Sequence, residues 1–176
     1  MTYLSPNFTL QEFTRSGTAK RLNINNEPNG RQIRNLRYLC VTLLEPLRSA
    51  LRAKVHPKAR IIITSGFRVP ELNLAVGGVK TSQHPKGEAA DIRVDDGEGR
   101  RLLTPQELFD FIVAEGLPFW QLINEYDEWV HLSLKPLPAM FQRQQKLWVY
   151  REKGKVRWAV SRPIAMDFDT QNAPPT

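Results

Sequence analysis

Two short segments, each carrying one histidine, constrain this chain more than any others. Residues 82–91 contain His84 and Asp91, and the strand-like residues 129–133 contain His131. Two His and one Asp can form a three-ligand zinc site whose fourth position stays open for water, as in catalytic rather than structural zinc sites. The chain has only three His, and two of them lie in these segments.

Each of these residues taken alone has a simpler interpretation. A His before Pro in a loop is usually a surface residue, and a His in an apolar strand is usually a hydrogen-bonded core residue. An Asp at the start of an apolar run is often a turn residue. Spacing alone therefore leaves both the zinc site and a purely structural role open.

Several short motifs around these segments follow one another in a distinctive order. They are Ser65-Gly66-Phe67-Arg68, Asn73, Val76-Gly77-Gly78, Thr81-Ser82-Gln83-His84, Gly87, Ala89, Asp91 and Trp129-Val130-His131, preceded by residues 7–16 and 35–48. Together, from about Leu4 to about Ser133, they resemble the zinc D-Ala-D-Ala carboxypeptidase family, and more narrowly its phage and prophage peptidoglycan peptidases. The resemblance implies that His84, Asp91 and His131 bind Zn²⁺. It also implies the fold shared by these peptidases and the hedgehog signalling domain.

Apolar spacing and turn residues predict the order of the helices and strands. Helices are expected after two capping boxes, at residues 9–12 and 104–107, and over residues 33–51 and 70–76. Pro46 interrupts the pattern of the helix over residues 33–51. Strands are expected over residues 61–65 and 89–94 and in two hairpins, 121–134 and 146–160, while residues 15–30 read as an extended loop. This mixed order favours an α+β fold with a small, mainly antiparallel sheet and flanking helices.

The length of 176 residues fits one domain with a proper core. We expect a single zinc peptidase domain over residues 1–166, in which residues 135–166 form a C-terminal β extension, followed by a disordered tail over residues 167–176. Cys40 is the only Cys and lies on the apolar face of an expected helix, so we expect it in the core, and no intrachain disulfide is possible.

The chain is basic, with a formal net charge of +7 and a pI of about 9.8. This charge suits a polyanionic partner, either nucleic acid or an anionic cell wall, or serves solubility alone. The Lys and Arg residues are spread along the chain, and no nucleic-acid-binding motif is present, so we expect no nucleic-acid partner.

The N-terminal residues lack a basic region followed by an apolar run, and no segment is apolar enough to span a membrane. We therefore expect no signal peptide, no membrane partner and synthesis in the cytoplasm. We also expect the protein to be a monomer. Action on a cell wall would then follow release from the cell or take place as part of a phage particle.

Two glutamates are candidates for the catalytic base. A hairpin loop at residues 127–129 would pair Glu125 with His131, whereas Glu128 would lie at the hairpin tip. Phage-type relatives carry a Glu after a Gln-Leu-Ile run, which corresponds to Glu125, and related dipeptidases place theirs at Glu-x-x-His, which corresponds to Glu128. We favour Glu125 and leave Glu128 open.

Other polar residues are expected around the zinc site. Arg68 follows a buried strand, and the resemblance implies that its fork grips a substrate carboxylate or steadies a developing oxyanion; the alternative is an ordinary surface Arg. The residues expected to bind substrate along the cleft are Asn73, Ser82, Gln83 and Trp129.

These features predict a zinc metallopeptidase that hydrolyses stem or cross-bridge peptides of peptidoglycan. It would be either a D-Ala-D-Ala carboxypeptidase or an endolysin-type endopeptidase. The alternative is a non-catalytic, zinc-containing module of the same fold that binds cell wall. The two candidate bases argue against that alternative, because a module without chemistry needs no base.

Overall fold

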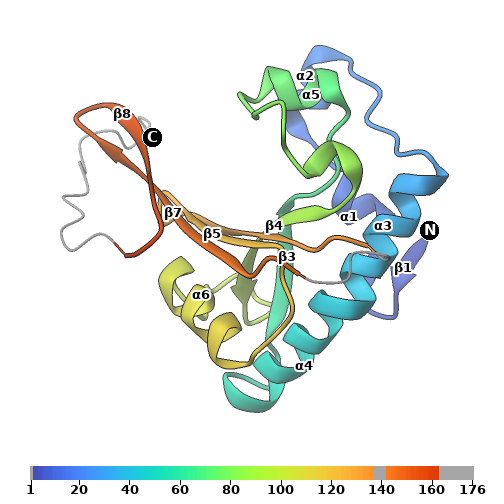
Figure 1. The fold of residues 1–176 in the computed structure, drawn as a ribbon. Helices are drawn as coiled ribbons and strands as arrows, with labels where there is room; N and C mark the ends of the chain where they lie inside the picture. The colour runs from blue at the N-terminus through green and yellow to red at the C-terminus, as the bar shows by residue number, and fades with distance from the viewer. Residues whose placement is uncertain (1, 137–141, 163–176) are drawn as a thin grey trace.

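A six-stranded sheet forms the centre of the fold (Figure 1) in the computed structural model, which describes residues 2–136 and 142–162. The strand order is β3-β4-β6-β5-β7-β8. All neighbouring strands are antiparallel except β5 and β7, which are parallel. The strands are β3 (Arg60–Ser65), β4 (Ala89–Asp95), β5 (Gln121–Glu125), β6 (Trp129–Ser133), β7 (Gln145–Glu152) and β8 (Lys155–Ala159). The mainly antiparallel sheet and the α+β class are confirmed.

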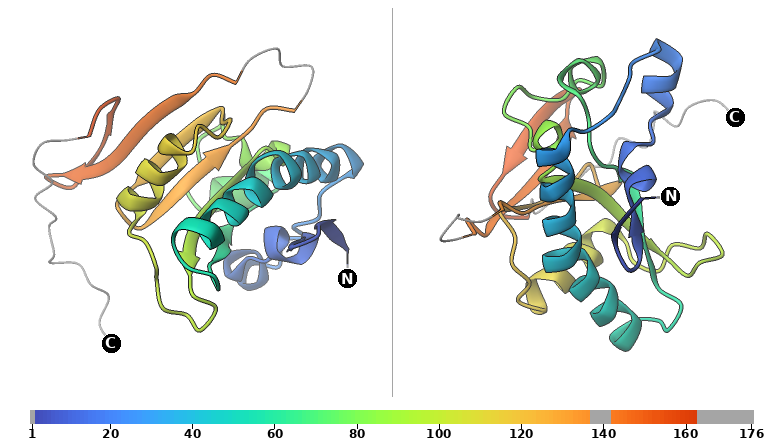
Figure 2. Two further views of the ribbon diagram at one scale, coloured as in Figure 1. Left: turned by 90° about the horizontal axis from the view of Figure 1, so that it is seen from below. Right: turned by 90° about the vertical axis from the view of Figure 1, so that its right-hand side faces the viewer.

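One face of the sheet is covered by two helical elements, which lie side by side over it in Figure 2. The first is a long helical segment made of α3 (Gly30–Leu39), the π-helical turn η1 (Cys40–Leu44) and α4 (Glu45–Lys54), and the second is α6 (Pro105–Ala114). Their apolar side chains and those of the sheet form one core cluster. Cys40 belongs to it and is fully buried, as predicted. Burial of this face supplies the main driving force for folding.

The predicted interruption at Pro46 takes the form of a widened turn rather than a break. Pro46 is the second residue of α4, and the π turn η1 comes directly before it. A Pro inside a helix clashes with the carbonyl group four residues earlier. A wider turn at that point relieves the clash, so the apolar stripe continues through it. Leu43, Leu47 and Leu51 are accordingly all fully buried.

The N-terminal region differs from the prediction in one element. The Thr9-Glu12 capping box opens α1 (Leu10–Thr14), as expected, after the small sheet of β1 (Tyr3–Ser5) and β2 (Phe8–Thr9). The predicted loop over residues 15–30 is wrong in part, because it contains α2 (Gly17–Leu22). Ser16 caps this helix by accepting from the Ala19 N–H, and Ala19 is buried. Local capping and burial outweigh the polar composition here.

The remaining predicted elements are present. The helix α5 (Pro70–Ala75) and the 3₁₀ turn η2 (His84–Lys86) precede β4, and Thr104 and Glu107 form the capping box of α6. Both expected hairpins occur, as β5–β6 and β7–β8. The tail predicted to be disordered, residues 167–176, lies outside the described residues. None of the described helices has the length and hydropathy needed to cross a membrane.

The second face of the sheet carries the polar residues singled out in the sequence. Along β4, Ala90, Ile92 and Val94 belong to the core cluster, so Asp91 points to the other face, as the alternation predicts. Figure 1 shows α2 and α5 on this side of the sheet and α6 on the opposite side. A small apolar cluster of Ile123, Leu147 and Val149 continues this second face across β5 and β7.

Candidate metal centre and active site

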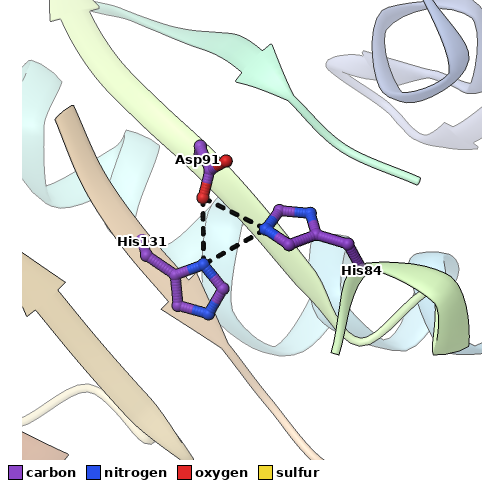
Figure 3. A group of neighbouring side chains, drawn as sticks. All are labelled: His84, Asp91 and His131. Carbon is purple, nitrogen blue, oxygen red and sulfur yellow. Dashed lines mark hydrogen bonds and ion pairs between the residues drawn. The ribbon is translucent and has the colours of Figure 1, made fainter. Parts of the chain in front are cut away.

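The strand register brings two of the three candidate ligands together. Asp91 on β4 lies directly opposite His131 on β6, and side chains in directly opposite positions project to the same face of a sheet. His84 comes from η2, the turn that leads into β4. Figure 3 shows the three side chains pointing toward one another. The predicted group thus converges on one point.

The distances within this group match those of a metal site. His84 Nε2 lies 3.2 Å from His131 Nδ1 and 3.2 Å from Asp91 Oδ1, and His131 Nδ1 lies 2.9 Å from Asp91 Oδ1. Atoms bound at about 2.0–2.1 Å around a tetrahedral Zn²⁺ are about 3.3–3.4 Å apart. All three residues are buried. Two imidazoles and a carboxylate at this spacing fit Zn²⁺ with little movement.

A backbone carbonyl sets the orientation of the His84 ring. His84 Nδ1 lies 2.6 Å from the carbonyl oxygen of Gly66, which can only accept, so Nδ1 carries the proton. The lone pair of Nε2 therefore faces Asp91 and His131. Gly66 itself has no room for a side chain, because an added Cβ would lie 2.6 Å from the backbone of Phe13 in α1. The packing of α1 against the end of β3 thus fixes the carbonyl that orients the ring.

His84 and Asp91 are in the protonation states that a metal ligand requires. Burial lowers the pKa of His84, which favours the neutral imidazole. Burial alone would raise the pKa of Asp91, but the interactions of its carboxylate with the neighbouring His84 and His131 outweigh burial and hold that pKa below its usual range. Asp91 is therefore ionised beside an imidazole that presents its lone pair.

Helix α3 holds the turn that carries His84. Gln32 donates through Nε2 to the Pro85 carbonyl at 2.8 Å, and Asn35 donates through Nδ2 to the Lys86 carbonyl at 2.8 Å. Gly87 then reverses the chain at a φ of +70°, and an added Cβ would lie 2.6 Å from the Gln32 carbonyl oxygen. No local pattern in the sequence marks these two side chains of α3.

Arg68 lies against the metal group rather than on the outer surface. Its guanidinium donates to Asp91 Oδ2 at 3.3 Å, its side chain is only 15% exposed, and its Nε has no partner among the described residues. Asn26 clamps the backbone on both sides of it, donating to the Phe67 carbonyl at 2.9 Å and accepting from the Val69 N–H at 2.9 Å. Asn26 therefore positions Arg68, and no local pattern in the sequence marks it.

Glu125 lies on the same face of the sheet as His131, although its predicted pairing is wrong. The residue opposite His131 is Ile123, and Glu125 is opposite Trp129. The hairpin loop is residues 126–128, because Tyr126 and Asp127 both adopt left-handed backbone with a φ of 56°. The shift is by two residues along the strand, so the face of Glu125 is unchanged.

The two candidate bases have different surroundings. Burial and the charge of Asp91 raise the pKa of Glu125, while His131, Trp129 and Arg68 oppose this rise. The Trp129 indole donates to Glu125 Oε2 at 3.2 Å. Glu128 is exposed; its N–H donates to the Glu125 carbonyl at 3.0 Å, and its own carbonyl accepts from Arg101 at 2.8 Å. Glu125 is thus the glutamate whose titration responds to the metal group.

The four residues expected to bind substrate have mixed positions. Asn73 is buried and donates to the Val79 carbonyl at 3.1 Å, so it supports the loop before η2. Gln83 donates to the side-chain oxygen of Gln121, and Gln121 donates through Nε2 to Gln145 Oε1 on β7 at 2.7 Å. Ser82 accepts from the His84 N–H at 3.3 Å. Trp129 is partly exposed, and its indole lies beside Glu125.

The family model described as Peptidase M15 matches residues 6–133, which is more than half of the 176 residues and includes His84, Asp91 and His131. The strands β7 and β8 lie outside the match. No curated protein matches the chain. The chain therefore belongs to the Peptidase M15 family, the family of the zinc D-Ala-D-Ala carboxypeptidases.

Proposed function

We propose that the chain hydrolyses peptide bonds in the stem or cross-bridge peptides of peptidoglycan, with one Zn²⁺ held by His84, Asp91 and His131. Family membership supports a zinc peptidase of cell-wall peptides in general. The observation that carries the proposal is the buried triangle of two imidazoles and one carboxylate, with Glu125 and Arg68 beside it. A site built only for structure would need neither of these two neighbours.

Each neighbour has a role in amide hydrolysis. Zinc, when bound, supplies Lewis acidity that polarises a carbonyl group and makes water a nucleophile near neutral pH. Glu125 acts as the general base, because a carboxylate with a raised pKa can take a proton from the attacking water and return it to the leaving amine. Arg68 offers the developing oxyanion a fixed cationic donor that is already desolvated.

Residues 1–166 are proposed as a single peptidase domain, in which residues 135–166 form a β extension. The basic charge suits an anionic wall. We further propose that the protein acts as a monomer in the lysis machinery or tail of a phage or prophage. Its function would not involve nucleic acid. The rival is a non-catalytic module of the same fold that binds wall through the same metal, and the surroundings of Glu125 favour the peptidase over it.

Mass spectrometry of digested peptidoglycan tests the proposal and identifies the bond. Purified peptidoglycan is incubated with the protein, with the protein plus a chelator, and with the chelated protein after zinc is restored. We expect new peptide termini in the first and third samples and none in the second. The Glu125→Gln variant serves as the control for a contaminating hydrolase. Wall binding without any new terminus would support the non-catalytic module instead.

A further inference from the structure

A cavity between the start of α2 and the end of β3 is lined by three arginines. Its volume is about 470 Å³, and its lining includes Arg15 just before α2, Arg21 within α2 and Arg68 after the end of β3. The hydroxyl groups of Ser16, Thr18 and Ser65 add further polar lining. None of the described residues that line it carries a carboxylate. The cavity is therefore cationic, with hydrogen-bond donors around it.

The charges of Arg15 and Arg21 are not neutralised by neighbouring side chains. Among residues 2–136 and 142–162, the ion pairs include neither of them. Arg21 makes one long contact of 3.5 Å, to Thr18 Oγ1. A guanidinium fork matches the two oxygens of a carboxylate. Two such forks over one cavity, without an acidic partner, favour an anionic ligand.

The cavity adjoins the metal group through β3. Arg68, which lines the cavity, contacts Asp91 Oδ2 at 3.3 Å. Thr64, also in the lining, donates through Oγ1 to the Asp91 carbonyl at 3.0 Å. Ser65 is the residue opposite Asp91 in the β3–β4 register. A ligand in the cavity would therefore lie next to the peptide bond that the metal group acts on.

We propose that this cavity binds a carboxylate of the peptide substrate through Arg15 and Arg21, and that the contact selects substrates carrying it. This inference rests on the proposed function. A stem peptide offers two sources of the group. One is the C-terminal α-carboxylate next to the cleaved bond, which a carboxypeptidase recognises. The other is the free carboxylate of an internal residue, which an endopeptidase would meet.

Three synthetic stem peptides separate the two sources. The parent ends in D-Ala-D-Ala with all carboxylates free, the second has its C-terminus amidated, and the third has its internal carboxylate amidated. Values of kcat and KM are measured for the zinc-loaded wild type, for the double variant Arg15→Gln/Arg21→Gln, and for Lys20→Gln. Lys20 is an exposed residue of α2 that does not line the cavity, and its variant tests the loss of positive charge on the same helix.

For the wild type, we expect one of the two amidations to raise KM roughly 10-fold to 100-fold, with kcat little changed. The double variant should show the raised KM already with the parent peptide. Its KM values for the parent peptide and for that amidated peptide should therefore be equal. Lys20→Gln should behave as the wild type. The amidation that has the effect identifies the source of the carboxylate.

Equal KM values for all three peptides in the wild type would overturn the inference, as would a double variant that still discriminates. A rise of the same size in Lys20→Gln would indicate general charge attraction and would overturn it too. If the wild type cleaves none of the peptides, the proposed hydrolysis of stem peptides fails, and calorimetric titration with the same peptides then decides the role of the cavity. Carboxylate-dependent affinity that the double variant loses supports the cavity site, and equal affinity contradicts it.

Discussion

Asp91 and His131 face each other directly across β4 and β6, and Asp91 Oδ1 lies 2.9 Å from His131 Nδ1. Their relative position is therefore set by backbone pairing in the centre of the sheet. Rigid strands hold functional side chains more accurately than loops do. The third member, His84, comes from a turn. The Gly66 carbonyl binds the His84 ring, and the side chains of Gln32 and Asn35 donate hydrogen bonds to the backbone of the turn.

The first prediction concerns the base. Glu125→Gln should lower kcat by roughly 10²-fold to 10⁴-fold, because it removes a proton acceptor beside the metal group. It should leave zinc content at one per chain, because Glu125 is not in the His-Asp-His group. Glu128→Gln, at the exposed hairpin tip, is the matched control and should keep near wild-type activity. A dead Glu128→Gln beside an active Glu125→Gln would reverse the assignment.

The second prediction concerns Arg68. Arg68→Ala should raise the activation free energy by about 2–4 kcal/mol, because one desolvated donor to the oxyanion is lost. Arg68→Lys should recover little of this, since a point charge cannot copy the fork. The measurement is kcat/KM with thermal unfolding run alongside. Wild-type kcat/KM in the Ala variant would remove Arg68 from the mechanism.

The third prediction concerns the turn that carries His84. Gly87→Ala should lower zinc content well below one per chain, because its Cβ would collide with the Gln32 carbonyl and displace the turn. Gly77→Ala is the control, since Gly77 also has a positive φ, of +77°, but has open space around it. The control should lose about 1 kcal/mol of stability from backbone strain and keep its zinc. Equal zinc content in both variants would show that the close approach of α3 is not needed.

The fourth prediction concerns acid stability away from the site. Glu45 accepts from Ser5 and Asn7 and so joins α4 to the N-terminal hairpin. Burial alone would raise the pKa of Glu45, but these hydrogen bonds lower it below its ordinary value of 4.5. A carboxyl group with a lower pKa in the folded state stabilises the fold above its unfolded pKa and loses that effect as the pH falls through the folded pKa.

Glu45→Gln should therefore lower the free energy of unfolding by about 1 kcal/mol at pH 7, a small value because solvent screens a partly exposed group. The difference between wild type and variant should shrink as the pH falls below 4.5. Urea unfolding of both proteins across this range gives the measurement. A difference that stays constant with pH would mean that the charge of Glu45 plays no part.

Structural features that depend on neighbouring residues in the sequence, such as helix starts and strand faces, were predictable. The capping boxes at Thr9 and Thr104 gave the starts of α1 and α6, and the alternation along β4 gave the face on which Asp91 lies. The candidate ligands also follow from local segments, because the motifs around them are short. These are the patterns that periodicity and capping can reveal.

What the sequence did not reveal depends on long-range polar contacts and on unusual backbone. Asn26 bonds to Phe67, and Gln32 bonds to Pro85, across 41 and 53 residues, and no local pattern marks such pairs. The β5–β6 register was missed because two consecutive non-glycine residues, Tyr126 and Asp127, adopt left-handed backbone. Such conformations are uncommon for non-glycine residues, so turn rules do not anticipate two in succession.

The most direct test of the metal site is anomalous X-ray scattering from a zinc-loaded crystal. We predict a single peak at about 2.0–2.2 Å from His84 Nε2, His131 Nδ1 and an Asp91 carboxylate oxygen. That result would establish the ligand set from which the proposed chemistry follows. A peak elsewhere on the chain, or the three side chains turned apart with no peak between them, would contradict the account.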